Sequence, residues 1–108
     1  MRMWNIETNK MCNKHLLGEH VEMHMFVGTL NKNKSIKGYL DNGLVEVHNI
    51  RKRHNTLVKE MKKRGMNHQS ELPNYKSQTI GKVNVNSNEK DLFNRCEECN
   101  KLKELNKK

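Results

Sequence analysis

The segment HLLGEHVEMHMFVG, residues 15–28, concentrates side chains that could do chemistry. Within it, His15, Glu19 and Glu22 are spaced i, i+4 and i+7, so on a helix they share one face. A carboxylate on such a face can stabilise positive charge or transfer protons, provided that it faces a reacting group. A solvated polar face is the commoner interpretation of this spacing, so the spacing needs support from other features of the chain.

A second set of residues could bind a metal ion. His20 and His24 share one helix face, and Cys96-x-x-Cys99 has the spacing of zinc ligands. The histidine segment is not an HExxH motif, because its glutamate follows the first histidine by two positions and lies on another side of the helix. A lone CxxC pair also lacks the second pair that structural zinc usually has. We therefore expect no metal, and a zinc-binding nucleic-acid protein using these four residues is an alternative.

The chain is small and strongly basic. Its 108 residues, of which 33% are hydrophobic, fit one domain spanning 1–108, and its formal net charge is +9. Such a charge favours a polyanionic partner, either nucleic acid or an acidic membrane surface. No stretch approaches the ~18 apolar residues of a membrane helix, and the start MRMWNIETNK has no apolar signal core. Three cysteines, an odd number, do not form a disulfide framework. We expect a nucleic-acid partner, no membrane and a cytoplasmic location.

Hydrophobic residues at helical spacing predict the elements that position these side chains. After an N-terminal arm at residues 1–12, helices are predicted at 13–31, at about 47–64 and at about 88–105. The residues expected to face the core are Leu16, Met23, Val27 and Leu30 in the first helix, Ile50, Leu57, Val58 and Met61 in the second, and Leu92, Phe93 and Leu102 in the third. The basic residues of the second helix, Arg53 among them, are expected to lie mostly outside its buried stripe.

The connections between these helices are polar and irregular. Residues 32–43 are rich in turn-forming residues, and residues 66–87 have no helical period, although residues 82–85 could form a short strand. Gly65 is a suitable stop for the second helix, and Trp4 is expected to pack the arm against the helices. The predicted fold is therefore all-α: a compact three-helix single domain with long irregular loops.

Three sequence features together resemble the pyrimidine-dimer DNA glycosylases, the phage-type endonuclease V family. The pattern HLxxExxE begins at residue 15, the fourteen residues before it have an arginine in second position, and the later helix ends in KRG at residues 63–65. The resemblance covers roughly residues 1–65. It implies a DNA-repair enzyme that excises damaged pyrimidines, above all cyclobutane dimers, and then cleaves the strand as an abasic-site lyase.

The resemblance also implies a mechanism without a cofactor. In that family the α-amine of the first residue attacks C1′ of the damaged nucleotide and forms an imine. An α-amino group has a pKa of about 7.7–8.0, so a useful fraction is neutral and nucleophilic near neutral pH. Counting back from His15 places the nucleophile on Met1, which should remain in the protein because Arg2 is too large to permit its removal. Glu22 matches the family's catalytic glutamate.

Several basic residues are candidates for contacts with DNA. By resemblance, Arg2 lies near the lesion, His15 contacts DNA, and Lys32 contacts a phosphate. Charge alone adds six candidates for phosphate contacts: Lys14, Arg51, Arg53, Lys62, Lys63 and Arg64. Two arginines that flank the catalytic glutamate in the phage form are Val21 and Met25 here, and the aromatic-rich C-terminal tail is missing. Both departures affect lesion preference.

The sequence thus predicts a monomeric glycosylase and abasic-site lyase that acts on damaged double-stranded DNA in a bacterial or virus-infected host cell. A basic DNA-binding accessory protein that kept the scaffold and lost the chemistry is the non-enzymatic alternative. It would bind DNA in a salt-sensitive way without forming a covalent intermediate.

Overall fold

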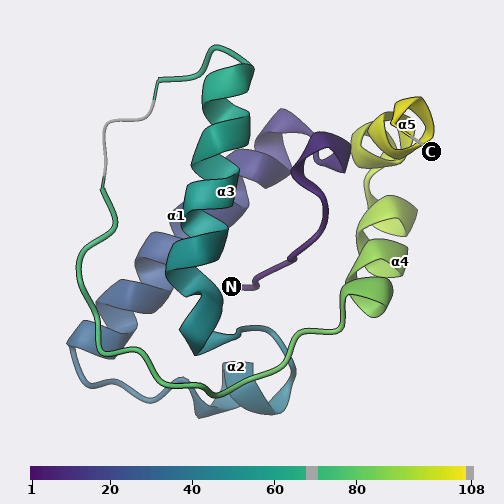
Figure 1. Cartoon of the computed structure of the whole chain (residues 1–108). Coiled ribbons are helices and arrows are strands. Elements are labelled where there is room, and N and C mark those ends of the chain that lie inside the picture. The colour runs from purple at the N-terminus through teal and green to yellow at the C-terminus, as the bar shows by residue number, and fades with distance from the viewer. Residues whose placement is uncertain (68–70, 107–108) are drawn as a thin grey trace.

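The computed structural model describes residues 1–67 and 71–106, and its regular elements are all helical (Figure 1). In chain order they are the 3₁₀ helix η1 (Thr8–Lys10), α1 (Asn13–Asn31), α2 (Lys37–Asp41), the 3₁₀ helix η2 (Val47–Asn49), α3 (Ile50–Lys63), α4 (Val85–Arg95) and α5 (Glu97–Leu105). The described residues include no strand. The prediction of an all-α fold is confirmed, with more helices than the three expected.

The predicted C-terminal helix is in fact two helices, because the chain breaks at Cys96. This residue has extended backbone angles (φ −124°, ψ 108°), which end α4, and its sulfur accepts a hydrogen bond from the Cys99 amide, which caps α5. The short strand suggested at residues 82–85 is wrong. Asn84 caps α4 by accepting a hydrogen bond from the Ser87 amide, so that Val85 already begins the helix. A short helix, α2, also interrupts the first connection.

The core lies where α1 and α3 pack against each other. All four residues predicted to face inward from the second helix are buried, and so are Leu16, Met23 and Val27 of α1. The arm covers one side of this core with Met3 and Ile6. Trp4 is buried as predicted. Burial of this stripe supplies most of the stability of the small domain.

One charged pair is buried inside this core. The guanidinium of Arg53 on α3 makes two hydrogen bonds to the carboxylate of Glu19 on α1, at 2.6 and 2.9 Å, and both side chains are at least 94% buried. The same guanidinium lies 3.3 Å from the sulfur of Met11 at the end of the arm. The expectation that Arg53 lies outside the buried stripe and contacts DNA is therefore wrong. Its positive charge instead compensates the negative charge of the buried Glu19 carboxylate.

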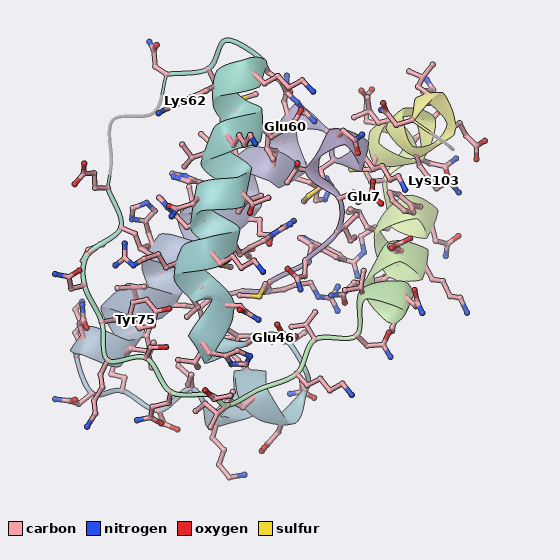
Figure 2. All side chains as sticks on the ribbon, in the orientation of Figure 1. Glu7, Glu46, Glu60, Lys62, Tyr75 and Lys103 are labelled. Atoms are coloured by element: carbon pink, nitrogen blue, oxygen red, sulfur yellow. The ribbon has the colours of Figure 1, made fainter. Side chains whose placement is uncertain are left out.

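Residues 71–84, which precede α4, run past α2 along the edge of the molecule and lead to α4 beside the arm (Figure 1). Tyr75 donates a hydrogen bond to the Val47 carbonyl at 2.9 Å, and Glu46 accepts one from the Val83 amide at 2.8 Å, near the N-terminal end of α3 (Figure 2). At Gly81, with φ +94°, a side chain would collide with the Val45 carbonyl oxygen. These contacts determine where α4 and α5 reach the N-terminal arm.

Replacing Arg53 by methionine should destabilise the protein by about 3–5 kcal/mol, because the Glu19 carboxylate would be left buried without its partner. The double variant Glu19→Leu/Arg53→Met should recover most of that loss, since it removes both charges together. Urea denaturation of the two variants and the wild type measures this. Equal stability of the single and double variants would show that the loss does not come from the unpaired Glu19 carboxylate.

Candidate active site

The N-terminal arm, α1 and α4 surround an open pocket of about 520 Å³. Ten residues line it: Met1, Arg2, Trp4, Lys14, His15, Gly18, Glu19, Glu22, Leu44 and Arg95. The N-terminus of the chain therefore lies inside the molecule, beside α1 and α3 (Figure 1). The pocket combines a primary amine, a carboxylate and a rim of cationic side chains.

The amine of Met1 lies 4.0 Å from the nearer carboxylate oxygen of Glu22, and the two side chains are only 12% and 29% exposed. The arm is held in this position from both sides. The Met3 amide donates to the Leu44 carbonyl at 2.7 Å, and the buried side chain of Asn88 on α4 donates to the carbonyls of Met3 and Trp4, at 3.3 and 2.9 Å. The sequence-predicted pair of Met1 and Glu22 is thus brought together.

The environment of Glu22 changes its acidity. Burial raises the pKa of the Glu22 carboxyl above its ordinary value, although the charge of the Met1 amine and a hydrogen bond from the Arg2 backbone oppose the rise. A carboxylate with a raised pKa is a better base than an exposed one, and it exchanges its proton closer to neutral pH. Glu22 is therefore suited to proton transfer beside the amine.

Arg2 is positioned by residues of α4 that the sequence did not single out. Its guanidinium pairs with Asp91 at 2.5 Å and stacks over the Trp4 ring, 4.3 Å from the ring centroid. Arg95 pairs with the same carboxylate at 2.9 Å and approaches the same ring. The hydrogen bond from Arg2 holds the pKa of Asp91 below its ordinary value. Helical spacing places Asp91 and Arg95 on one face, but only the fold shows that this face meets the arm.

His15 also lines the pocket, and its Nδ1 lies 3.2 Å from the sulfur of Cys12. Its ring meets the Trp4 ring edge to face, with centroids 6.2 Å apart. Burial lowers the pKa of His15, and the nearby charges of Lys14 and Arg95 lower it further. The imidazole is therefore predominantly neutral at neutral pH.

The other predicted DNA contacts are distributed over the molecule. Lys14 lines the pocket, whereas Lys32, Lys62 and Lys63 are exposed on the ends of α1 and α3 and do not line it. Arg51 and Arg64 are engaged within the protein instead. Arg51 donates to the Pro73 carbonyl at 2.9 Å, and Arg64 donates to side chains or carbonyls of three residues: Thr8, Asn13 and Glu60. Of these six, Lys14 alone lines the pocket with Met1.

The positions where the phage form has arginines lie on the outer side of α1. Val21 and Met25 are 52% and 50% exposed, and neither lines the pocket. Both are large apolar side chains in contact with solvent. The helix that carries Glu22 therefore has two fewer positive charges than the phage form. The cationic side chains that line the pocket are Arg2 of the arm, Lys14 and Arg95 of α4.

The regular elements of this protein are helices, and its pocket holds an amine and a half-buried carboxylate beside cationic side chains. Such a site is suited to a polyanionic substrate. The sequence profile of the family described as pyrimidine dimer DNA glycosylase matches residues 1–74, and the chain belongs to this family. The match includes the arm, α1 and α3, and ends before α4. Neither a curated protein nor a solved structure matches the chain. Among the described residues, no helix has the length and apolar character required to cross a membrane.

The raised pKa of Glu22 predicts a pH-dependent effect on stability. The folded protein holds this proton more tightly than the unfolded chain, so ionising Glu22 reduces stability as the pH rises from the unfolded pKa through the folded one. Glu22→Gln should therefore melt at a higher temperature than the wild type at pH 7, and the difference should vanish in acid.

Thermal unfolding followed by circular dichroism between pH 3 and 8 provides this comparison, with Glu71→Gln as the control because Glu71 is exposed. A Glu22→Gln variant that melts below the wild type at pH 7 would mean that the ionised carboxylate stabilises the fold.

Proposed function

We propose that this chain removes damaged pyrimidines from duplex DNA through its N-terminal amine and then cleaves the strand at the resulting abasic site. The observation that carries the proposal is the Met1 amine, held 4.0 Å from Glu22 in a pocket open to solvent. Membership of the pyrimidine dimer DNA glycosylase family supports cyclobutane dimers as the substrate. No cofactor takes part in these steps, and the protein acts as a monomer.

The chemistry follows from the two groups that face each other. The lone pair of the Met1 amine attacks C1′, and the glycosidic bond breaks with its electron pair leaving on the base. The nitrogen then loses one proton, and its lone pair opens the C1′–O4′ bond while O4′ takes up a proton, which gives a protonated imine. The Glu22 carboxylate then takes a proton from C2′, and elimination expels the 3′ phosphate. While it is ionised, the same carboxylate stabilises positive charge developing on the sugar.

The cationic rim of the pocket supports DNA as the polyanion. Arg2, Lys14 and Arg95 line the pocket together, in a protein of net charge +9. Such a rim can neutralise phosphates on both sides of an extruded nucleotide. Extrusion is needed because a stacked duplex hides C1′ from a nucleophile attached to a folded protein. The Trp4 ring lies beneath the guanidinium of Arg2 and holds it at the rim.

Borohydride reduction tests the imine directly. Incubating the protein with duplex DNA that carries one thymine dimer, or one abasic site, should give a covalent adduct on the Met1 amine with both substrates, located by mass spectrometry. Protein whose N-terminus is acetylated, or extended by an uncleaved tag, should give none. An adduct on a lysine would assign the nucleophile elsewhere, and trapping with the abasic site alone would restrict the protein to the lyase step.

Glu22→Gln should slow strand cleavage about 10²–10⁴-fold, the usual contribution of a positioned acid–base group. DNA affinity should change little, because the amide keeps the shape of the side chain and the cations of the rim remain. Single-turnover cleavage and fluorescence anisotropy measure the two quantities, with Glu71→Gln as the matched control. Cleavage at the wild-type rate would remove Glu22 from the mechanism.

The second candidate function is a DNA-binding protein without chemistry. The exposed Val21 and Met25 favour it, because they stand where the phage form has arginines beside its catalytic glutamate. This protein would bind DNA more tightly at low salt but yield no borohydride adduct with either substrate. The trapping experiment therefore separates the two candidates.

A further inference from the structure

Four side chains with metal-binding atoms meet at one edge of the pocket. Cys12 and His15 come from the start of α1, and Cys96 and Cys99 come from the start of α5, 84 residues further along the chain. Their three sulfurs and one imidazole nitrogen all lie within 4.8 Å of one another. In Figure 1, α5 lies beside η1, the turn that leads into α1. These four residues are called the Cys₃His cluster below.

The two halves of the Cys₃His cluster are built in the same way. Cys12 is the N-cap of α1 and His15 is the third residue of that helix, while Cys96 is the N-cap of α5 and Cys99 is its third residue. Each half is therefore a pair with two residues between the ligands, the spacing that zinc sites use. Both helix N-termini direct the positive end of their dipoles toward the sulfurs, which favours thiolate.

The distances between the ligand atoms correspond to the edges of a zinc tetrahedron. With Zn–S of about 2.3 Å and Zn–N of about 2.0–2.1 Å, tetrahedral geometry places two sulfurs about 3.8 Å apart and sulfur and nitrogen about 3.6 Å apart. The Cys12 and Cys96 sulfurs are 3.8 Å apart. Nδ1 of His15 is 3.2 Å from the Cys12 sulfur and 3.7 Å from the Cys99 sulfur.

The surroundings of the Cys₃His cluster resemble those of a thiolate site more than those of a disulfide. A disulfide requires sulfurs about 2.05 Å apart, far closer than the 3.8 Å between Cys12 and Cys96, and all three cysteines are free. The Cys12 amide donates to the Cys99 sulfur at 3.2 Å, and the Cys99 amide donates to the Cys96 sulfur at 3.5 Å. Donors of this kind orient metal ligands and stabilise their charge.

We propose that Cys12, His15, Cys96 and Cys99 bind one Zn²⁺ in a closed tetrahedral site. Three thiolates and one imidazole occupy all four positions of the metal, so the site is structural rather than catalytic. The proposal is independent of the function proposed above. It replaces the expectation that the chain binds no metal. It also changes the partners of the CxxC pair, because His20 and His24 lie in a separate cluster with His54.

The zinc would join the C-terminal helices, which lie outside the family match, to the start of α1. Arg95 directly precedes Cys96, and Asp91 lies one turn earlier on α4, so the metal would hold the wall of the pocket that orients Arg2. Binding through Nδ1 leaves Nε2 of His15 as a hydrogen-bond donor toward DNA. The DNA contact expected of His15 and its role as a ligand are therefore compatible.

Metal analysis of the full-length chain tests the proposal. Protein produced without a histidine tag or chelator, in medium supplemented with zinc, should contain one zinc per chain by plasma mass spectrometry. Cys96→Ser should lose it, whereas His24→Asn should keep it. Wild-type protein that contains no zinc would overturn the proposal. So would zinc that remains in Cys96→Ser and disappears from His24→Asn, which would place the metal at the three histidines.

Two measurements on the wild type avoid dependence on the folding of a variant. Cobalt added to the zinc-free protein should give the thiolate-to-metal charge-transfer band and the intense visible bands of tetrahedral cobalt with sulfur ligands, and zinc should abolish them. Chelator should lower the melting temperature of the zinc-loaded protein and make all three thiols reactive. An octahedral cobalt spectrum, an unchanged melting temperature, or a mass 2 Da low from a disulfide would each overturn the proposal.

Discussion

The buried ion pair between Glu19 and Arg53 determines how α1 is rotated about its axis. Because the Glu19 carboxylate is held by two hydrogen bonds to a guanidinium on α3, its face of the helix points inward. Glu22 follows three residues later, so it emerges at the margin of the core, half-buried and beside the arm. The position of Glu22, and therefore the raised pKa of its carboxyl, depends on this buried ion pair one turn earlier on the helix.

The second constraint is the position of the N-terminus. A free amine is useful only if the first residues of the chain are ordered, and chain ends are ordinarily poorly held. Here the arm is bonded to the Leu44 carbonyl on one side and to the Asn88 side chain on the other. Asn88 belongs to α4, which lies beyond the family match. Helix α4 thus helps to hold the arm that carries the amine.

Helix α4 also adds positive charge to the pocket, to which α1 contributes only Lys14. With Val21 and Met25 at the positions of the phage arginines, the cationic side chains that line the pocket are Arg2, Lys14 and Arg95. Asp91 holds Arg2 and Arg95 together, and Arg95 is followed directly by Cys96 of the Cys₃His cluster. The pocket wall and the Cys₃His cluster are therefore adjacent parts of one chain segment, so a metal bound to the cluster would also stiffen the pocket.

The sequence by itself determined the local features of this protein. The periodicity of apolar residues predicted α1, α3 and all of their buried apolar residues except Phe26, since helical spacing is a property of neighbouring positions. The spacing from Met1 to Glu22, with the resemblance, predicted the two groups that meet in the pocket. The tertiary structure decided what depends on distant residues: the burial of Arg53, the break at Cys96, and the approach of Cys96 and Cys99 to Cys12 and His15. A basic residue or a lone CxxC pair looks the same in sequence whether it faces solvent or a partner 84 residues away, because packing alone brings the partner into contact.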